Sequence, residues 1–264
     1  MSIIHAEFLS SCLRRQVSFK AIIPLEKPGT RVPEKRNLKT LYLLHGYMGN
    51  CTDWLADSCV HELAQRHDMA VIMPSGENSF YVDNPDNESF FGEFIGDEIV
   101  GFTRALFPLS VKREDTLIGG FSMGGFGAIR NGLKYTEVFG SVIALSSALI
   151  TDKLADATMD YSKAPESEKY YVKTFGSLDR LGGSDNDPKA LAKKAADSKG
   201  LFPDLYMACG TEDFLIEENR SFKKYMEKLR VPFTYVEEPG SHDWKFWNPQ
   251  IEKALDWYDN IHTT

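Results

Sequence analysis

Short apolar runs recur along the chain and alternate with longer amphipathic stretches. Seven such runs occupy residues 17–24, 40–46, 69–74, 115–121, 140–146, 203–210 and 232–238. They are too short and too rich in β-branched residues for helices, so they predict strands. The stretches between them predict helices over residues 52–67, 93–107, 123–135, 214–230 and 247–261. Continuously apolar strands that alternate with helices predict an α/β fold, with a mostly parallel central sheet and helices on both faces.

Residues 151–200 interrupt this alternation. The segment is polar and mixed, and only residues 188–198 have a helical pattern. Long insertions at the strand ends of such sheets often form lids or specificity loops. We therefore predict a single domain over residues 1–264, with a lid or specificity insertion at 151–200; an inert surface loop is the alternative.

Composition limits the possible partners and the compartment. The formal net charge of −8 disfavours binding to nucleic acid or to an anionic membrane surface. No stretch approaches the ~20 apolar residues of a membrane span, and no basic start followed by an apolar run marks a leader. The four cysteines have no metal-ligand spacing, so we expect free thiols, no metal and a cytoplasmic location: Cys12, Cys51, Cys59 and Cys209.

Residues 120–124 read Gly-Phe-Ser-Met-Gly, which fits the pattern G-x-S-x-G. The pattern follows a predicted strand and opens a predicted helix, the context in which it forms a tight turn that carries a nucleophilic serine. Glycines are needed there because side chains on both sides of the serine would collide. Ser122 is therefore the predicted nucleophile, at the amino end of a helix that favours negative charge.

The serine hydroxyl needs a base to take its proton. In α/β-hydrolases the chain order is serine, then Asp or Glu, then histidine, and only His242 and His262 follow Ser122 with room for an acid between. His262 is two residues from the end of the chain, so His242 is the predicted base. The acid is expected after the run 203–210, where Glu212 and Asp213 are both available.

Two backbone N–H groups should stabilise the oxyanion that forms during acyl transfer. One belongs to Met123, the residue after the nucleophile. The second should come from the loop after the run 40–46, where Gly46 allows close approach; Tyr47 is the predicted donor and Met48 the alternative. His45 is expected to be a structural residue beside this oxyanion hole.

With these motifs placed, the sequence resembles the esterase-D-like branch of α/β-hydrolases, and most closely the small bacterial tributyrin esterases. The matching segments are LYLLHGYMGNCTDWL (41–55), SFYVD (79–83), GGFSMGGFGA (119–128), CGTEDFL (209–215) and GSHDW (240–244). The branch also contains S-formylglutathione hydrolases, feruloyl and acetyl-xylan esterases, and mycolyltransferases. Tributyrin esterases usually carry Met after the His-Gly pair, where this chain has Tyr47.

The resemblance implies a serine carboxylesterase that uses Ser122, Asp213 and His242 without a cofactor. It favours Asp213 over Glu212, and it implies a small acyl ester as the substrate and possible homo-oligomers. A feruloyl or acetyl-xylan esterase is the alternative, and a catalytically silent binding protein is disfavoured because all three triad positions are filled. Trp54 and Tyr81 are candidate substrate-binding residues, with a packing role as the alternative.

Overall fold

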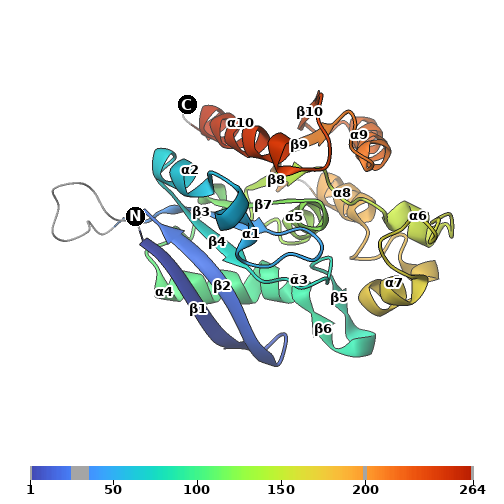
Figure 1. The fold of residues 1–264 in the computed structure, drawn as a ribbon, viewed down its shortest axis with the longest axis horizontal. Coiled ribbons are helices and arrows are strands. Elements are labelled where there is room, and N and C mark those ends of the chain that lie inside the picture. Colours follow the sequence, from blue (N-terminus) through green and yellow to red (C-terminus); the bar gives the residue numbers. More distant parts are fainter. Residues whose placement is uncertain (1, 25–35, 199–200, 263–264) are drawn as a thin grey trace.

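A computed structural model describes residues 2–24, 36–198 and 201–262. Its centre is an eight-stranded sheet in the order β1-β2-β4-β3-β7-β8-β9-β10 (Figure 1). The strands are β1 (Ser2–Ser10), β2 (Arg15–Ile23), β3 (Lys39–Leu44), β4 (Met69–Pro74), β7 (Thr116–Phe121), β8 (Ser141–Leu145), β9 (Asp204–Gly210) and β10 (Thr234–Glu238). Every pairing from β4 to β10 is parallel, whereas β1–β2 and β2–β4 are antiparallel. The predicted mostly parallel sheet is confirmed.

The seven apolar runs correspond to seven of these eight strands, with ends that differ by at most two residues. The sequence pattern did not single out β1. This strand lies at the edge of the sheet, where its residues alternate between half-buried and exposed. An edge strand with one solvated face lacks the continuous apolar run of the central strands. Two short strands, β5 (Asp83–Asn84) and β6 (Ser89–Phe90), form a separate antiparallel pair.

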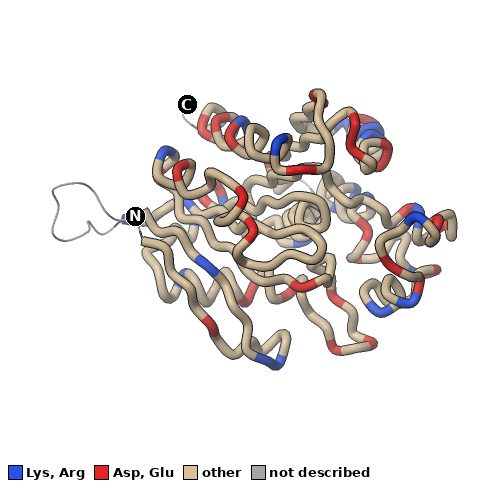
Figure 2. Tube along the Cα trace, viewed as in Figure 1, with Lys and Arg blue, Asp and Glu red and all other residues tan. Residues whose placement is uncertain are grey.

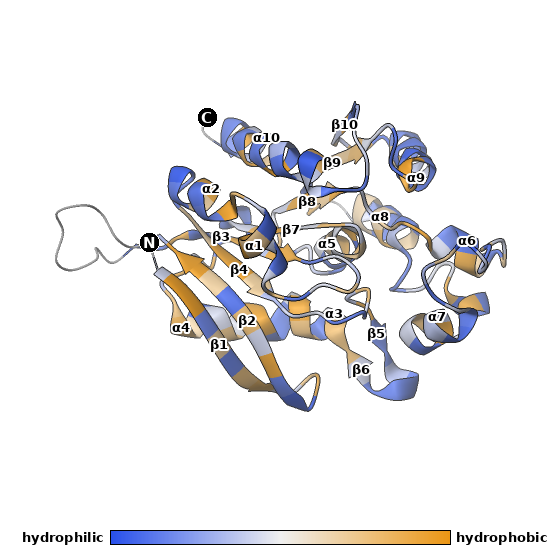
Figure 3. Cartoon of the chain, in the orientation of Figure 1, coloured by the Kyte–Doolittle hydropathy of each residue, from blue (hydrophilic) through white to orange (hydrophobic). Residues whose placement is uncertain are grey.

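Helices cover both faces of the sheet, and the apolar residues of the strands lie between the two helical layers (Figures 1 and 3). One face is covered by α1 (Asp53–Asp57), α2 (Val60–Arg66) and α10 (Trp244–His262). The other is covered by α3 (Phe91–Glu93), α4 (Ile99–Leu106), α5 (Met123–Lys134), α8 (Pro188–Asp197) and α9 (Ile216–Leu229). The predicted helix 52–67 is divided, because Ser58 is extended between α1 and α2. The predicted helix 93–107 contains a π-helical turn, η2 (Phe94–Glu98).

The segment 151–200 contains α6 (Thr151–Ala155), α7 (Glu168–Phe175), the 3-10 turn η4 (Leu178–Arg180) and α8; its last two residues lie outside the described part. Helix α8 packs against α5, and α7 lies beside β5. The helix predicted over 188–198 is confirmed as α8. The remaining 3-10 turns are η1 (Pro85–Asn87) and η3 (Arg113–Asp115).

Charged side chains lie mostly on the outer helices and loops, whereas the central strands carry few (Figure 2). Within the described ranges, no helix is both long enough and apolar enough to cross a membrane. In the same residues, no group of three or more His, Cys, Asp or Glu side chains is arranged to hold a metal ion. The four cysteines are free thiols.

Candidate active site

Ser122 is the single residue between the end of β7 and the start of α5. Few residues adopt the backbone conformation that it has. Its φ is 54° and its ψ is −119°, a strained conformation for a residue with a side chain. A Cβ on Gly120 would lie 2.5 Å from the Gly124 backbone, and one on Gly124 would lie 2.5 Å from the Leu44 carbonyl oxygen. Both glycines are therefore required by backbone that cannot move away, as the sequence pattern predicts.

The structure brings Ser122, His242 and Asp213 into one hydrogen-bonded chain, although they lie far apart in the sequence. His242 Nε2 is 2.9 Å from Ser122 Oγ. On the other side of the ring, His242 Nδ1 is 2.9 Å from Asp213 Oδ2 and 3.1 Å from Oδ1. Since a carboxylate only accepts, Nδ1 carries a proton and Nε2 of the neutral ring is free to accept the serine proton.

Asp213 is fully enclosed and is held in its ionised form. Burial alone raises the pKa of this carboxyl, but the hydrogen bond and charge of His242 and the N–H of Leu215 outweigh it, so the net pKa is below the ordinary value. Glu212 has a different position: it is exposed, and its carboxylate accepts from the N–H of Gly240. Of the two acids that the sequence left open, only Asp213 contacts the histidine.

Two residues that line the cavity with Ser122 carry the candidate backbone donors, Met123 and Tyr47. Met123 is the first residue of α5, so its N–H has no partner within the helix. In the loop after β3, Met48 donates its N–H to Asn78 Oδ1 at 2.8 Å, which leaves Tyr47 as the better candidate for the second donor. His45 is buried with both ring nitrogens on backbone groups: Nδ1 is 2.7 Å from the Gly46 oxygen, and Nε2 accepts from Gly76 N at 2.8 Å. It holds the loop in place and is not aimed at the serine.

A cavity of about 700 Å³ opens onto Ser122 and His242. Its walls come from the loops after β3, β4, β7, β8, β9 and β10, from the starts of α9 and α10, and from residues 153–171 of the segment described above. Aromatic side chains make up much of the lining: Tyr47, Phe80, Tyr170, Tyr171, Phe214 and Trp247. The lining is mostly apolar, with a few charged side chains among it, including Lys153 and Glu218.

Trp54 and Tyr81, the two candidate substrate-binding residues, do not reach this cavity. Trp54 is 1% exposed and donates from Nε1 to the Leu44 carbonyl oxygen at 2.9 Å. Tyr81 is fully buried and donates its hydroxyl to the His45 carbonyl oxygen at 3.0 Å. Both side chains hold the backbone of the loop after β3, so the packing alternative is correct and the substrate-binding assignment is wrong.

The sequence reasoning missed two aromatic residues beside the histidine. The Phe214 ring is 4.5 Å from the His242 ring and is 74% exposed. The Trp247 ring stands edge-on to His242 at 5.0 Å and donates from Nε1 to Ser146 Oγ at 3.0 Å. Each lies within five residues of a triad member in the sequence, and that adjacency is the signal that could have found them.

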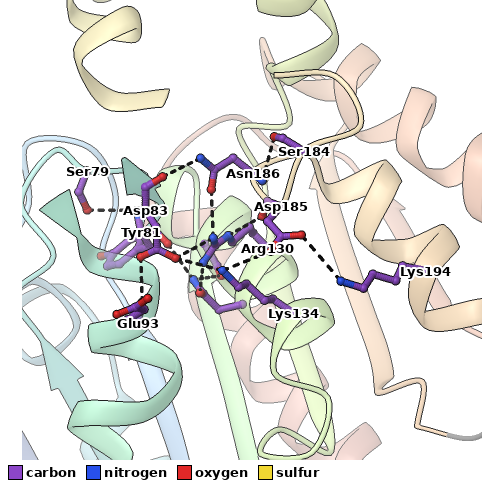
Figure 4. Close-up of polar contacts among 12 residues, drawn as sticks. Ser79, Tyr81, Asp83, Glu93, Arg130, Lys134, Ser184, Asp185, Asn186 and Lys194 are labelled. Atoms are coloured by element: carbon purple, nitrogen blue, oxygen red, sulfur yellow. Dashed lines mark hydrogen bonds and ion pairs between the residues drawn. The ribbon is translucent and has the colours of Figure 1, made fainter. Parts of the chain in front are cut away.

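A charge network around buried Arg130 joins α5 to the segment 151–200 (Figure 4). Arg130 of α5 is fully buried and donates to Asp83 Oδ2, to the Asp185 carbonyl oxygen and to Asn186 Oδ1, each at 3.0 Å. Asp83 also pairs with Lys134 at 3.2 Å. Burial raises the pKa of the Asp83 carboxyl, but the Arg130 charge dominates among the lowering effects, so the net pKa is below its usual value.

Comparison with known proteins agrees with this geometry. The sequence model of the Esterase family matches residues 13–258. An acetyl esterase of Caldicellulosiruptor saccharolyticus is 48% identical over 264 residues, which cover 99% of both chains. Among solved structures, the substrate-bound fluorophosphonate-binding serine hydrolase F of Staphylococcus aureus is 29% identical with a TM-score of 0.85, covering 97% of this chain and 98% of its own. An S-formylglutathione hydrolase of the same organism is also 29% identical, with a TM-score of 0.83 and the same coverage.

The parallel sheet with helices on both faces, the serine turn at its strand ends and these similarities lead to one conclusion. The chain belongs to the Esterase family and is a carboxylic ester hydrolase with the α/β-hydrolase fold.

Proposed function

We propose that this protein is a serine esterase that hydrolyses small acyl esters through Ser122, His242 and Asp213. The observation that carries the proposal is the chain of contacts from Ser122 Oγ to His242 Nε2 and from Nδ1 to Asp213, which opens onto the cavity of about 700 Å³.

In the acylation step, Ser122 Oγ attacks the ester carbonyl carbon while His242 Nε2 takes the hydroxyl proton. The carbonyl oxygen becomes an oxyanion, which accepts hydrogen bonds from the N–H groups of Tyr47 and Met123. His242 then gives the proton to the departing alcohol oxygen, and the acyl group remains on Ser122. The buried, ionised Asp213 fixes the ring orientation and stabilises the charged imidazolium.

Deacylation repeats these steps with water. His242 takes a proton from the water as its oxygen attacks the acyl carbon, and the same two N–H groups bind the second oxyanion. Collapse of this intermediate returns the proton to Ser122 Oγ and releases the carboxylic acid. Every proton passes through His242 Nε2, so the proposed cycle needs no group beyond the triad, the two donors and water.

The acyl group is proposed to be short, with acetyl as the first candidate because the 48% identical relative is described as an acetyl esterase. Feruloyl or acetyl-xylan esterase activity is the second candidate. The aromatic residues of the cavity wall favour it, since a feruloyl ring can stack on such side chains. A panel of p-nitrophenyl acetate, tributyrin, methyl ferulate and acetylated xylan separates these substrates by kcat/KM.

The assignment of the nucleophile is tested with Ser122→Ala on p-nitrophenyl acetate and butyrate. We expect kcat to fall by about six orders of magnitude, and labelling by a fluorophosphonate probe to disappear. Ser221→Ala, on the exposed surface of α9, is the matched control and should label as the unaltered protein does. Activity of Ser122→Ala at the unaltered level would reject the proposal.

A further inference from the structure

Glu218 is a buried carboxylate in the wall of the catalytic cavity. It is the third residue of α9 and is 8% exposed. Its Oε1 accepts from Lys153 Nζ of α6, another residue of the cavity wall. Its Oε2 is enclosed and has no hydrogen-bond partner among the described residues. The triad and the two backbone donors make no use of either side chain.

The position of Glu218 is fixed by its neighbour in the sequence. Asn219 is fully buried and donates from Nδ2 to the carbonyl oxygens of Ser147 and Leu215, at 2.9 and 2.8 Å. It also accepts from the N–H of Ser147 at 3.3 Å. These contacts join the first turn of α9 to the loop after β8, so Glu218 is presented by rigid backbone. Such support is typical of residues that select a ligand.

An enclosed carboxylate oxygen without a partner is unfavourable, which indicates a donor that arrives from elsewhere. The terminal torsion of a glutamate is soft, so a small rotation turns Oε2 toward the cavity. The Lys153 side chain is half exposed and can shift to admit a ligand. A donor that enters here would find a carboxylate acceptor and an ammonium donor side by side.

The paired charges decide what kind of group fits. An anionic ligand group would face the Glu218 carboxylate, and a cationic one would face the Lys153 ammonium. A neutral hydroxyl suits both, because it donates to the carboxylate and accepts from the ammonium. Two neighbouring hydroxyls could engage both partners at once. The pair is therefore suited to a polyol or a sugar.

The pair lines the same cavity as His242 and Phe214, so it borders the space that the departing alcohol can occupy. Glu218 follows the acid loop that carries Asp213 and Phe214, and Phe214 packs on the His242 ring. His242 must reach the alcohol oxygen to protonate it, so the alcohol part of the ester lies beside this histidine.

We propose that Glu218, with Lys153, is the specificity determinant that binds hydroxyl groups on the alcohol part of the ester, so that the substrate is an acylated polyol or sugar. This inference rests on the esterase function proposed above.

The test compares glycerol 1-acetate with propyl acetate, which differ only by two hydroxyls on the alcohol chain. In Glu218→Leu, we expect kcat/KM for glycerol 1-acetate, divided by that for propyl acetate, to fall about ten- to a hundred-fold. Lys153→Met should lower the ratio by a smaller factor, because the carboxylate remains. Glu217→Leu, in the same turn but exposed and paired with Arg220, is the matched control and should keep the ratio.

Acetylated xylan provides a second arm. A fall in kcat/KM for glycerol 1-acetate relative to propyl acetate indicates that the alcohol part of the substrate is a small polyol. A fall in kcat/KM confined to acetylated xylan indicates that the alcohol part is a polymer. Either result supports hydroxyl recognition by Glu218. An unchanged ratio in both arms, with propyl acetate still hydrolysed, overturns the inference and leaves the esterase proposal standing. If Glu218→Leu fails to fold, as judged by thermal unfolding, Glu218→Gln replaces it, and an unchanged ratio there also overturns the inference.

Discussion

The two sides of the catalytic cavity are built in different ways. The triad side stands on loops at the carboxyl ends of parallel strands, and backbone contacts such as Ser122 N to the Leu145 oxygen at 2.9 Å hold it. The opposite wall, from residues 153–171, is attached mainly by side chains: Tyr47 to Glu166, Lys153 to Glu218, and the Tyr170 hydroxyl to the Asn78 carbonyl oxygen. The positions of Ser122, His242 and Asp213 therefore depend on the backbone of the sheet. The shape of the opposite wall depends on side-chain contacts, which single substitutions can remove.

The largest expected effect tests the triad side. Asp213→Asn removes the charge that fixes the His242 tautomer, so we expect kcat on p-nitrophenyl acetate to fall by about 10⁴-fold. Glu212→Gln is the control, because Glu212 contacts the Gly240 backbone and not the histidine. A greater loss in Glu212→Gln than in Asp213→Asn would move the acid role to Glu212.

The next effect concerns the buried charge network that joins α5 to the segment 151–200. Asp83→Asn leaves Arg130 buried without its carboxylate, so we expect the free energy of unfolding at pH 7 to fall by about 3–5 kcal/mol. The pKa of Asp83 is lowered by folding. Its stabilisation is therefore complete above the unfolded aspartate pKa of about 4, and it is lost as the pH falls through the lower folded value.

Urea unfolding from pH 7 down to pH 2 measures both effects. The difference between Asp83→Asn and the unaltered protein should shrink as the pH falls, because protonation also neutralises the native carboxylate. Asp156→Asn, an exposed substitution on the segment 151–200, should leave stability within about 0.5 kcal/mol at every pH. A difference that does not depend on pH would contradict the ionic role of Asp83.

The smallest effect tests the side-chain contacts of the opposite wall. Tyr47→Phe removes the hydroxyl that donates to Glu166 but keeps the backbone N–H of the proposed oxyanion hole. We expect KM for tributyrin to rise about three- to ten-fold with little change in kcat, the size of one lost hydrogen bond. A large fall in kcat with constant KM would instead place the Tyr47 hydroxyl in the catalytic machinery.

The fold and the triad geometry could be predicted because backbone constraints leave local traces in the sequence. Seven central strands are visible as apolar runs, and Gly120 and Gly124 mark the turn around Ser122. Asp213 and His242 each stand in a loop directly after a strand, where the topology requires them. The three predicted residues, Ser122, Asp213 and His242, therefore lie close together in the structure.

The cavity wall could not be predicted in the same way, because it depends on contacts between residues distant in the sequence. Tyr81 belongs to the motif SFYVD (79–83), from which the sequence predicts a substrate-binding residue. In the structure its ring instead fills the space beside Gly127 and Gly76. Lys153 and Glu218 lie 65 positions apart, and nothing local in either segment indicates that they meet. This part of the cavity wall takes shape only when the segment 151–198 folds against the rest of the chain.

The positive φ of Ser122 sets activity against stability at a single residue. Glycine adopts such backbone angles readily, so a glycine there would relieve strain of about 1–3 kcal/mol while removing the reactive oxygen. Alanine keeps the Cβ and therefore the strain. Ser122→Gly is therefore expected to stabilise the fold while it removes the proposed nucleophile, whereas Ser122→Ala removes only the hydroxyl.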